Sequence, residues 1–155
     1  MAEPGIGDAA PDFDLPRDGG GRISLSQLRG SPIVLFFYPK DDTVGCTAES
    51  LAFTALDTEF KSVGATVIGM SPDSVKSHDK FCKKHGISVI LASDESTATL
   101  QAYGVWKEKS MYGRRFMGVE RTTFLLARDG SITTIWQKVR VPGHAEAVLE
   151  AVRNL

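Results

Sequence analysis

Hydrophobic residues fall into short unbroken runs that alternate with segments of helical spacing. Residues 33–38, Ile-Val-Leu-Phe-Phe-Tyr, form a continuous apolar run that Pro39 ends. The run is too short for most helices and rich in β-branched and aromatic residues, so it predicts a strand buried on both faces of a sheet. Residues 65–70 predict a second buried strand, and residues 88–91 predict a shorter third one.

Between the first two predicted strands, the apolar spacing becomes that of a helix. From about Cys46 onward, apolar side chains recur at three- and four-residue steps, at Phe53, Leu56, Phe60 and Val63. This spacing places them on one helix face, and Gly64 is suited to end the helix. We therefore expect one continuous helix between these two strands.

Two further helices are predicted after the second strand. The segment Ser71-Pro72-Asp73 predicts a helix start, with its serine as the N-cap and its proline in the first helical position. This helix is expected to run to about residue 85 and to stop at Gly86. A smaller helix is expected at residues 97–103.

The two ends of the chain have simpler patterns. Residues 122–126 and 131–136 are rich in strand-forming residues and flank Asp129-Gly130, which predicts a β-hairpin. A final helix is expected at about residues 145–153. The opening residues predict an extended arm or a hairpin that leads to a short helical turn at residues 26–29.

The predicted order alternates strands with helices until the closing hairpin. Alternating βαβ units imply right-handed crossovers and a sheet covered on both faces. We therefore expect an α/β protein with a thioredoxin-like fold, in which a central, mostly parallel mixed sheet has helices on both faces. The length of 155 residues fits a single domain over residues 1–155.

Composition narrows the partners and the compartment. The chain is 42% hydrophobic and 24% charged, as ordinary soluble proteins are. Its net charge of −1 gives no reason to expect nucleic acid or an acidic membrane as a partner. Residues 1–15 lack the apolar run of a signal peptide, and no later segment is long enough to span a bilayer, so a cytoplasmic protein is expected. In that reducing setting the two cysteines are expected to be free, catalytic or metal-bound.

Cys46 stands where the predicted elements favour a reactive group. It falls on the first turn of a predicted helix, just past the end of a central strand, and sites in open α/β sheets lie at such strand ends. A helix N-terminus offers free N–H groups and a partial positive charge, which both favour a thiolate. Thr43 precedes it by three residues, so a tight loop would aim its hydroxyl at the sulfur. The alternative is a small buried core residue, a common fate of free cysteine.

The residues around Cys46 resemble those of the peroxiredoxin family. The pattern Pro39-x-x-x-Thr43-x-x-Cys46 matches that family's active-site signature. The flanking segments FFYPKD (36–41) and GCTAE (45–49) resemble the bacterioferritin comigratory protein, or peroxiredoxin Q, branch. The resemblance covers nearly the whole chain, since it includes GDAAPDF (7–13), similar to the family's opening, and RTTFL (121–125), similar to its arginine-bearing strand.

The resemblance implies a thiol peroxidase that needs no cofactor or metal. Cys46 would be the peroxidatic residue, which attacks the terminal oxygen of a hydroperoxide. Thr43 would hydrogen-bond the peroxide and the sulfur, and Arg121 would hold the thiolate and polarise the O–O bond. Pro39 would shield the sulfur, and Glu49 would orient Arg121. Taken singly, Arg121 could instead be a surface salt-bridge residue and Thr43 a helix-start residue.

Chemistry explains why several groups would be needed around one sulfur. Stabilising a thiolate raises its population but weakens it as a nucleophile, so little rate is gained that way. Catalysis must then come mainly from groups that stabilise the charge that moves onto the departing peroxide oxygen.

Cys82 is the candidate for the second thiol. The sequence contains no Cys-x-x-Cys, and the position five residues after Cys46, where some members of this branch carry the resolving cysteine, is Leu51. Other members carry it on the following helix, and Cys82 matches that pattern. The resemblance therefore implies an intramolecular Cys46–Cys82 disulfide, recycled by a thioredoxin-like or glutaredoxin-like donor. A monomer is expected because the second thiol is available within the chain. Disulfide formation would require the start of the first helix to unwind, and the Cys82 turn as well. The alternative is a passive buried thiol in a one-cysteine enzyme.

Two other patterns have competing interpretations. His78, Cys82 and His85, with Cys46, could form a metal site, but this spacing on one helix is not a common ligand arrangement. We expect these histidines and Lys83-Lys84 to form a solvated helix face that modestly lowers the pKa of Cys82. The second pattern is an apolar stretch that contains Trp106, Met111, Tyr112, Phe116 and Met117. We expect it to form either a packed loop or a hydrophobic collar that admits alkyl hydroperoxides.

Two other functional classes use the same residues. A redox sensor would pass an oxidation signal to a partner as a disulfide and would react stoichiometrically with peroxide. A structural thioredoxin-like domain would have inert thiols and no Cys46 reactivity near neutral pH. Peroxide turnover with excess thioredoxin separates these classes from an enzyme.

Overall fold

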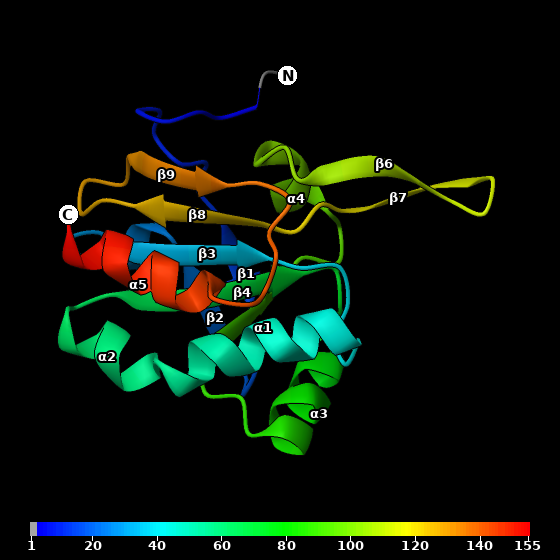
Figure 1. The fold of residues 1–155 in the computed structure, drawn as a ribbon, viewed down its shortest axis with the longest axis horizontal. Helices are drawn as coiled ribbons and strands as arrows, with labels where there is room; N and C mark the ends of the chain where they lie inside the picture. The colour runs from blue at the N-terminus through cyan, green and yellow to red at the C-terminus, as the bar shows by residue number, and fades with distance from the viewer. Residues whose placement is uncertain (1–2) are drawn as a thin grey trace.

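The computed structural model describes residues 3–155 and is built on one mixed sheet (Figure 1). Its strand order is β5-β4-β3-β8-β9, from β3 (Ile33–Phe37), β4 (Thr66–Ser71), β5 (Ile90–Ser93), β8 (Thr122–Leu126) and β9 (Ile132–Trp136). The first three pair in parallel, β8 runs antiparallel to β3, and β9 runs antiparallel to β8. The expected α/β fold with a closing hairpin is thus confirmed.

Both faces of the sheet are buried, and β3 shows why. All five of its residues are buried. Val34 and Phe36 contribute to one core cluster, whereas Ile33, Leu35 and Phe37 contribute to the other. Because side chains alternate along a strand, a continuous apolar run fills the core on both sides of the sheet.

Helices cover the two faces unequally. The face of Val34 and Phe36 packs against side chains from α1 (Val44–Ala55), α2 (Asp57–Ser62), α3 (Val75–His85) and α5 (His144–Arg153). The other face is covered by α4 (Ala98–Ala102) with its flanking residues and by the N-terminal hairpin. This hairpin consists of β1 (Asp14–Pro16) and β2 (Arg22–Ser24), and the 3-10 turn η1 (Ser26–Leu28) follows it. Within residues 3–155, no helix combines the length and apolar character that a bilayer crossing requires.

The structure differs from the expected helix boundaries at two places. The expected continuous helix is broken at Leu56, which ends α1 and precedes α2, although Phe53 and Phe60 still reach the same core. Helix α3 begins with Ser74 as its N-cap, because the Ser74 hydroxyl accepts a hydrogen bond from the Ser77 amide. Ser71, the expected N-cap, is instead the last residue of β4, and its hydroxyl donates to Asp73.

A further hairpin replaces the expected packed loop. Strands β6 (Trp106–Met111) and β7 (Arg114–Val119) form a separate two-stranded sheet that projects from the body (Figure 1). Tyr112 and Gly113 join the strands, both with positive φ, as a two-residue turn of type I′ requires. The apolar residues of this stretch are therefore strand and turn residues, and most of them are exposed.

Candidate active site

The peroxidatic candidate sits at the start of α1. Strand β3 ends at Phe37, the chain turns through residues 38–43, and Thr43 precedes α1 in an extended conformation. Cys46 is the third residue of the helix, so its sulfur lies by the first turn, where backbone N–H groups have no helical acceptor. The residue is only 1% exposed, and burial reduces the screening of nearby charges by water.

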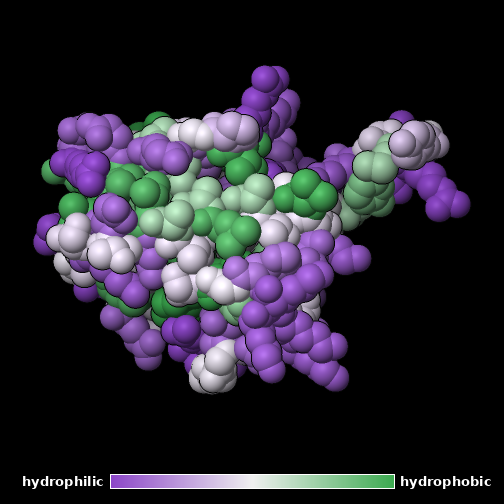
Figure 2. Space-filling model, turned by 60° about the horizontal axis from the view of Figure 1, so that its bottom comes forward, coloured by the Kyte–Doolittle hydropathy of each residue, from purple (hydrophilic) through white to green (hydrophobic). Residues whose placement is uncertain are grey.

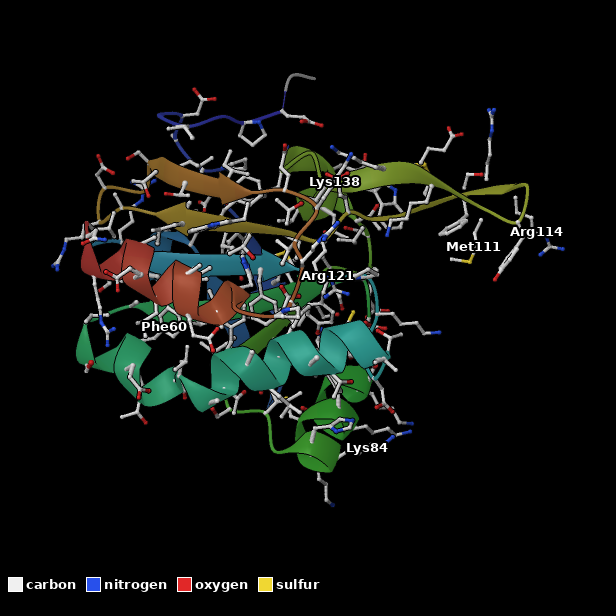
Figure 3. The ribbon with its side chains drawn as sticks, viewed as in Figure 1. Phe60, Lys84, Met111, Arg114, Arg121 and Lys138 are labelled. Atoms are coloured by element: carbon white, nitrogen blue, oxygen red, sulfur yellow. The ribbon has the colours of Figure 1, made fainter. Side chains whose placement is uncertain are left out.

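Strand pairing carries Arg121 to this helix. Arg121 immediately precedes β8, and Thr122 at the start of β8 pairs with Phe37 at the end of β3. The guanidinium donates from Nη2 to Cys46 Sγ at 3.3 Å and from Nη1 to Glu49 Oε1 at 2.7 Å. Cys46 and Glu49 are three residues apart and so share a helix face. The planar cation of Arg121, which Figure 3 labels, therefore joins the thiol to the carboxyl group.

Burial affects the pKa values of both Glu49 and Arg121. Glu49 is 1% exposed, and burial raises its pKa to about 7 although Arg121 acts in the opposite direction. Its Oε2 atom has no hydrogen-bond partner among the described residues. Burial opposes the charge of Arg121, but Glu49 and Cys46 outweigh it and raise the Arg121 pKa. Arg121 is therefore a fixed cation beside a carboxyl group that titrates near neutral pH.

The Glu49→Gln variant is expected to reduce the pH dependence of stability. A carboxyl whose folded pKa is raised stabilises the fold below its unfolded pKa, and this contribution is lost as the pH rises through the folded value of about 7. Because glutamine does not ionise, the loss of unfolding free energy between pH 5 and pH 8 should shrink by up to about 3 kcal/mol. Urea titrations at the two pH values measure this change in the free energy of unfolding. The exposed Glu150→Gln is the matched control, and an unchanged pH dependence in Glu49→Gln would contradict the assignment.

Thr43 and Pro39 both precede Cys46 in the chain, and they differ in how far they are exposed. The Thr43 side chain is exposed, and its hydroxyl donates to the Lys40 carbonyl at 2.9 Å. Among the described residues it makes no hydrogen bond to Cys46. Because its proton is engaged, the Thr43 oxygen is left as an acceptor. Pro39 is half-buried directly after the Tyr38 core position.

Gly45 lies against the guanidinium, and its small size matters there. A Cβ atom at this position would lie 3.1 Å from Arg121 Nη2. We expect Gly45→Ala to displace Arg121 by a few tenths of an ångström and to lower the rate constant for peroxide about tenfold, because catalysis is sensitive to such misplacement. Stopped-flow oxidation measures the rate constant. Gly5→Ala, whose Cβ would meet no atom closer than 3.7 Å, is the matched control. Equal rates for the two variants would show that this contact is unimportant.

Cys82 lies on α3 in a different environment. Its thiol is half-buried and faces Asp18, with 3.8 Å between Sγ and Oδ2. Burial raises the Cys82 pKa to about 12, and the charges of Asp18, Asp41 and Asp79 act in the same direction. The expectation that helix cations lower this pKa is therefore wrong, because burial and the surrounding carboxylates dominate. Both cysteines are free thiols in this structure.

The expected solvated histidine face is also wrong for His78, which is completely buried. Its Nδ1 lies 2.7 Å from Asp41 Oδ2 and its Nε2 lies 3.0 Å from the Ala92 carbonyl. The Tyr38 hydroxyl donates to the other Asp41 oxygen at 2.6 Å. Burial lowers the His78 pKa, but the Asp41 contacts outweigh it, so the net direction is upward.

This network also bears on metal binding. Both ring nitrogens of His78 face other partners, and His85 Nε2 lies 2.7 Å from Asp42, so neither histidine supports the Cys82-centred metal hypothesis. Asp41, Asp73 and His78 place ligand atoms within 4.8 Å of one another. Hydrogen bonds of Asp41 and Asp73 already occupy this cluster, which explains it as a structural connection between the Cys46 loop and α3.

Two more residues near Arg121 were not predicted from the sequence. His144, the first residue of α5, lies 2.8 Å from the Thr123 hydroxyl, and burial and Arg121 lower its pKa to about 4. It is therefore a neutral group behind the site. Lys109 on β6 is half-buried, and burial and Arg121 lower its pKa while Cys46 acts upward. Neither residue has a local motif, since each reaches the site only through strand pairing and packing.

Comparisons with known proteins agree on one family. Residues 6–135 match the model of the AhpC/TSA family. Peroxiredoxin Bcp of Xanthomonas campestris is 49% identical over 146 residues, which cover 93% of this chain and 91% of that protein. Peroxiredoxin Bcp of Bacillus subtilis is 40% identical over 150 residues, covering 97% and 96%.

Solved structures give the same answer. A mutant of Xylella fastidiosa PrxQ matches with a TM-score of 0.93 at 40% identity and covers 99% of this chain and 98% of its own. The bacterioferritin comigratory protein of Xanthomonas campestris, described with trapped intermediate and ligand complexes of alkyl peroxide reduction, matches with a TM-score of 0.90 at 45% identity, with coverages of 99% and 98%.

Proposed function

Since this chain belongs to the AhpC/TSA family, and within it to the Bcp and PrxQ peroxiredoxins, we propose that Cys46 reduces the hydroperoxide and that Cys82 resolves the product. The family membership makes the chain a peroxidase that takes its electrons from a thiol reductant. The observation that carries the residue assignment is the Arg121 guanidinium, which donates to Cys46 and Glu49 together.

The first step transfers one oxygen atom to Cys46. The thiolate attacks the terminal oxygen of the hydroperoxide, the O–O bond breaks, and the alcohol or water leaves with a proton while Cys46 becomes a sulfenic acid. Arg121 offsets the negative charge that moves from the sulfur toward the departing oxygen. The Thr43 hydroxyl donates its own proton to the Lys40 carbonyl, so its oxygen accepts a hydrogen bond from the peroxide O–H. Hydrogen peroxide and organic hydroperoxides both have this reacting unit.

The second step joins the two sulfurs. Cys82 attacks the sulfenic sulfur, water leaves, and the Cys46–Cys82 disulfide forms. With a pKa of about 12, Cys82 is ionised in only about one molecule in 10⁵ at pH 7. Its Sγ also faces Asp18, and a disulfide needs the two Cα atoms within about 7 Å. We propose that the start of α1 and the Cys82 turn unwind for resolution, which would also remove the burial that keeps Cys82 protonated.

The last step returns both cysteines to thiols. A strained, exposed disulfide is the kind that an external dithiol reopens, and thioredoxin, or a glutaredoxin-like protein, is the proposed donor. Because both cysteines belong to one chain, a monomer suffices for the cycle. The reducing cytoplasm is the proposed location, since it would keep the two thiols free between cycles.

The test is mass spectrometry after one equivalent of hydrogen peroxide. We expect a monomer that has lost two hydrogen atoms, with a peptide that joins Cys46 to Cys82. Protein alkylated before the peroxide is added provides the control. A disulfide between two chains, or a persistent oxide on Cys46 with a free Cys82, would contradict the proposed cycle.

A further inference from the structure

The hairpin of β6 and β7, called the β6–β7 hairpin below, has a surface that the proposed cycle does not use. It stands clear of the body in both views (Figures 1 and 2). Among the described residues, half of the exposed large apolar side chains belong to this hairpin. Their exposed fractions are 58% for Met111, 97% for Tyr112, 44% for Phe116 and 49% for Met117. Exposed apolar groups gathered on one element mark an interaction site.

The charge of the β6–β7 hairpin differs from that of the rest of the chain. It contains two lysines, two arginines and one glutamate, a net charge of +3. The whole chain has net charge −1, so −1 minus +3 leaves −4 on all other residues. Arg115 lies 3.5 Å from Glu108, and Lys107 pairs with two carboxylates, whereas Arg114 and Lys109 have no carboxylate partner within residues 3–155. The hairpin therefore offers unpaired positive charge beside apolar side chains.

The base of the β6–β7 hairpin borders the active site. Strand β7 ends two residues before Arg121, and Figure 3 shows Met111 and Arg114 at the far end of the hairpin. Lys109, at mid-strand, lies close enough to Cys46 and Arg121 for their charges to affect its own pKa. From Lys109 to Tyr112 is three residues, or ~10 Å along a strand.

That length is short compared with a protein interface. A typical interface covers ~800 Å² on each partner, a patch of ~16 Å radius. A protein that docks over Lys109 would therefore also meet the turn of the β6–β7 hairpin.

We propose that the β6–β7 hairpin is the docking surface for the protein that reduces the Cys46–Cys82 disulfide, a dithiol protein whose reactive cysteine is surrounded by acidic and apolar residues. This inference rests on the proposed function. In the step that it serves, a thiolate of the reductant attacks one sulfur of the disulfide and forms a mixed disulfide. The second thiol of the reductant then displaces that sulfur, so Cys46 and Cys82 become thiols and the reductant is oxidised.

The residue types favour a protein over a lipid surface. Tyrosine, phenylalanine, methionine and arginine are enriched in protein interfaces and dominate the turn and β7. An anionic bilayer would attract the β6–β7 hairpin but repel the remaining chain, with its net charge of −4. An acidic patch on a partner protein would meet only the cationic hairpin, and such complementarity raises the rate of association.

The test compares two double variants with two reductants. Tyr112→Ser with Arg114→Glu alters the β6–β7 hairpin, and Ile6→Ser with Arg128→Glu is the matched control. The control positions are exposed, and the N-terminal segment beside Ile6 bonds to the β8–β9 turn that carries Arg128. Thioredoxin, kept reduced by its reductase and NADPH, is the protein probe, and dithiothreitol is the small one.

We expect the hairpin variant to lower kcat/KM for thioredoxin about tenfold at low salt and to flatten its salt dependence, because charge complementarity speeds association. Turnover with dithiothreitol and the first peroxide step should stay within about twofold, and the control variant should match the wild type in all measurements.

Other outcomes overturn the inference. An unchanged kcat/KM for thioredoxin means that the β6–β7 hairpin is not the docking surface, and an equal loss with dithiothreitol means that it serves the chemistry instead. If the hairpin variant alone loses binding to phosphatidylglycerol vesicles, or converts a dimer to a monomer in sedimentation, a membrane or a second copy is the partner. Failure of the wild type to form the Cys46–Cys82 disulfide overturns the proposed function, and is seen before any reductant is added.

Discussion

Replacing Arg121 with methionine is expected to lower the second-order rate constant for hydrogen peroxide by about 10²–10³-fold, the usual effect of removing one preorganised donor from a reacting centre. Arg121 donates to Cys46 at 3.3 Å in a site almost closed to water, where no other cation of the described residues contacts the sulfur. Methionine fills similar volume but offers neither charge nor hydrogen bonds. Stopped-flow measurement of Cys46 oxidation provides the rate constant, with Cys46→Ser as the blank.

Loss of Arg121 also removes the partner of a buried carboxyl group, so rate and stability must be separated. Arg121→Met combined with Glu49→Gln removes the unpaired carboxyl and should recover stability lost in the single variant, without recovering the rate. Arg121→Lys keeps the charge but not the two-pronged geometry, and should have an intermediate rate. If the double variant regained the wild-type rate constant, Arg121 would be a structural residue.

Cys82→Ser is expected to stop catalytic turnover with thioredoxin after the first oxidation of Cys46, since no disulfide can form within the chain. The first oxidation of Cys46 should keep its wild-type rate, because Cys82 faces Asp18 and makes no hydrogen bond with the active-site residues. Excess peroxide should then drive Cys46 to sulfinic acid. NADPH consumption measures turnover, and intact mass measures the oxide.

A small dithiol provides the control for Cys82→Ser. Dithiothreitol is small enough to reach the buried Cys46 sulfur directly and should restore part of the turnover, whereas the much larger thioredoxin should not. Cys82→Ala should behave in the same way, so that any effect of the new hydroxyl is separated from the loss of sulfur. Sustained wild-type turnover of either variant with thioredoxin would mean that Cys46 works alone.

The sequence predicted those parts of the molecule that depend on local pattern. The apolar run of residues 33–38 has the composition of a strand buried on both sides, and it forms β3. Cys46 follows that strand at the start of α1, and the arginine of the RTTFL segment immediately precedes the strand that pairs with β3. Each of these features is recognisable from a short stretch of sequence, and the pairing of β3 with β8 brings Arg121 to Cys46 in the fold.

The incorrect predictions depend on residues far apart in the chain. The Cys82 pKa is raised by burial and by Asp18, which lies 64 residues earlier. His78 has the sequence pattern of an exposed polar helix residue, but in the fold it packs against Asp41, 37 residues earlier. The sequence does not predict the β6–β7 hairpin, because Tyr112-Gly113 is a less common turn pair than Asn-Gly and because apolar and polar residues do not alternate along residues 106–111.

The connection between Asp41 and His78 has a consequence for the slow motions of this protein. Asp41 precedes α1 and His78 lies one turn before Cys82. Both are buried, and 2.7 Å separates Asp41 Oδ2 from His78 Nδ1. Displacing either residue leaves the other as an unpaired polar group without water, at a cost of several kcal/mol. The amides of the two segments should therefore exchange with deuterium at matched rates, because a single cooperative opening exposes both.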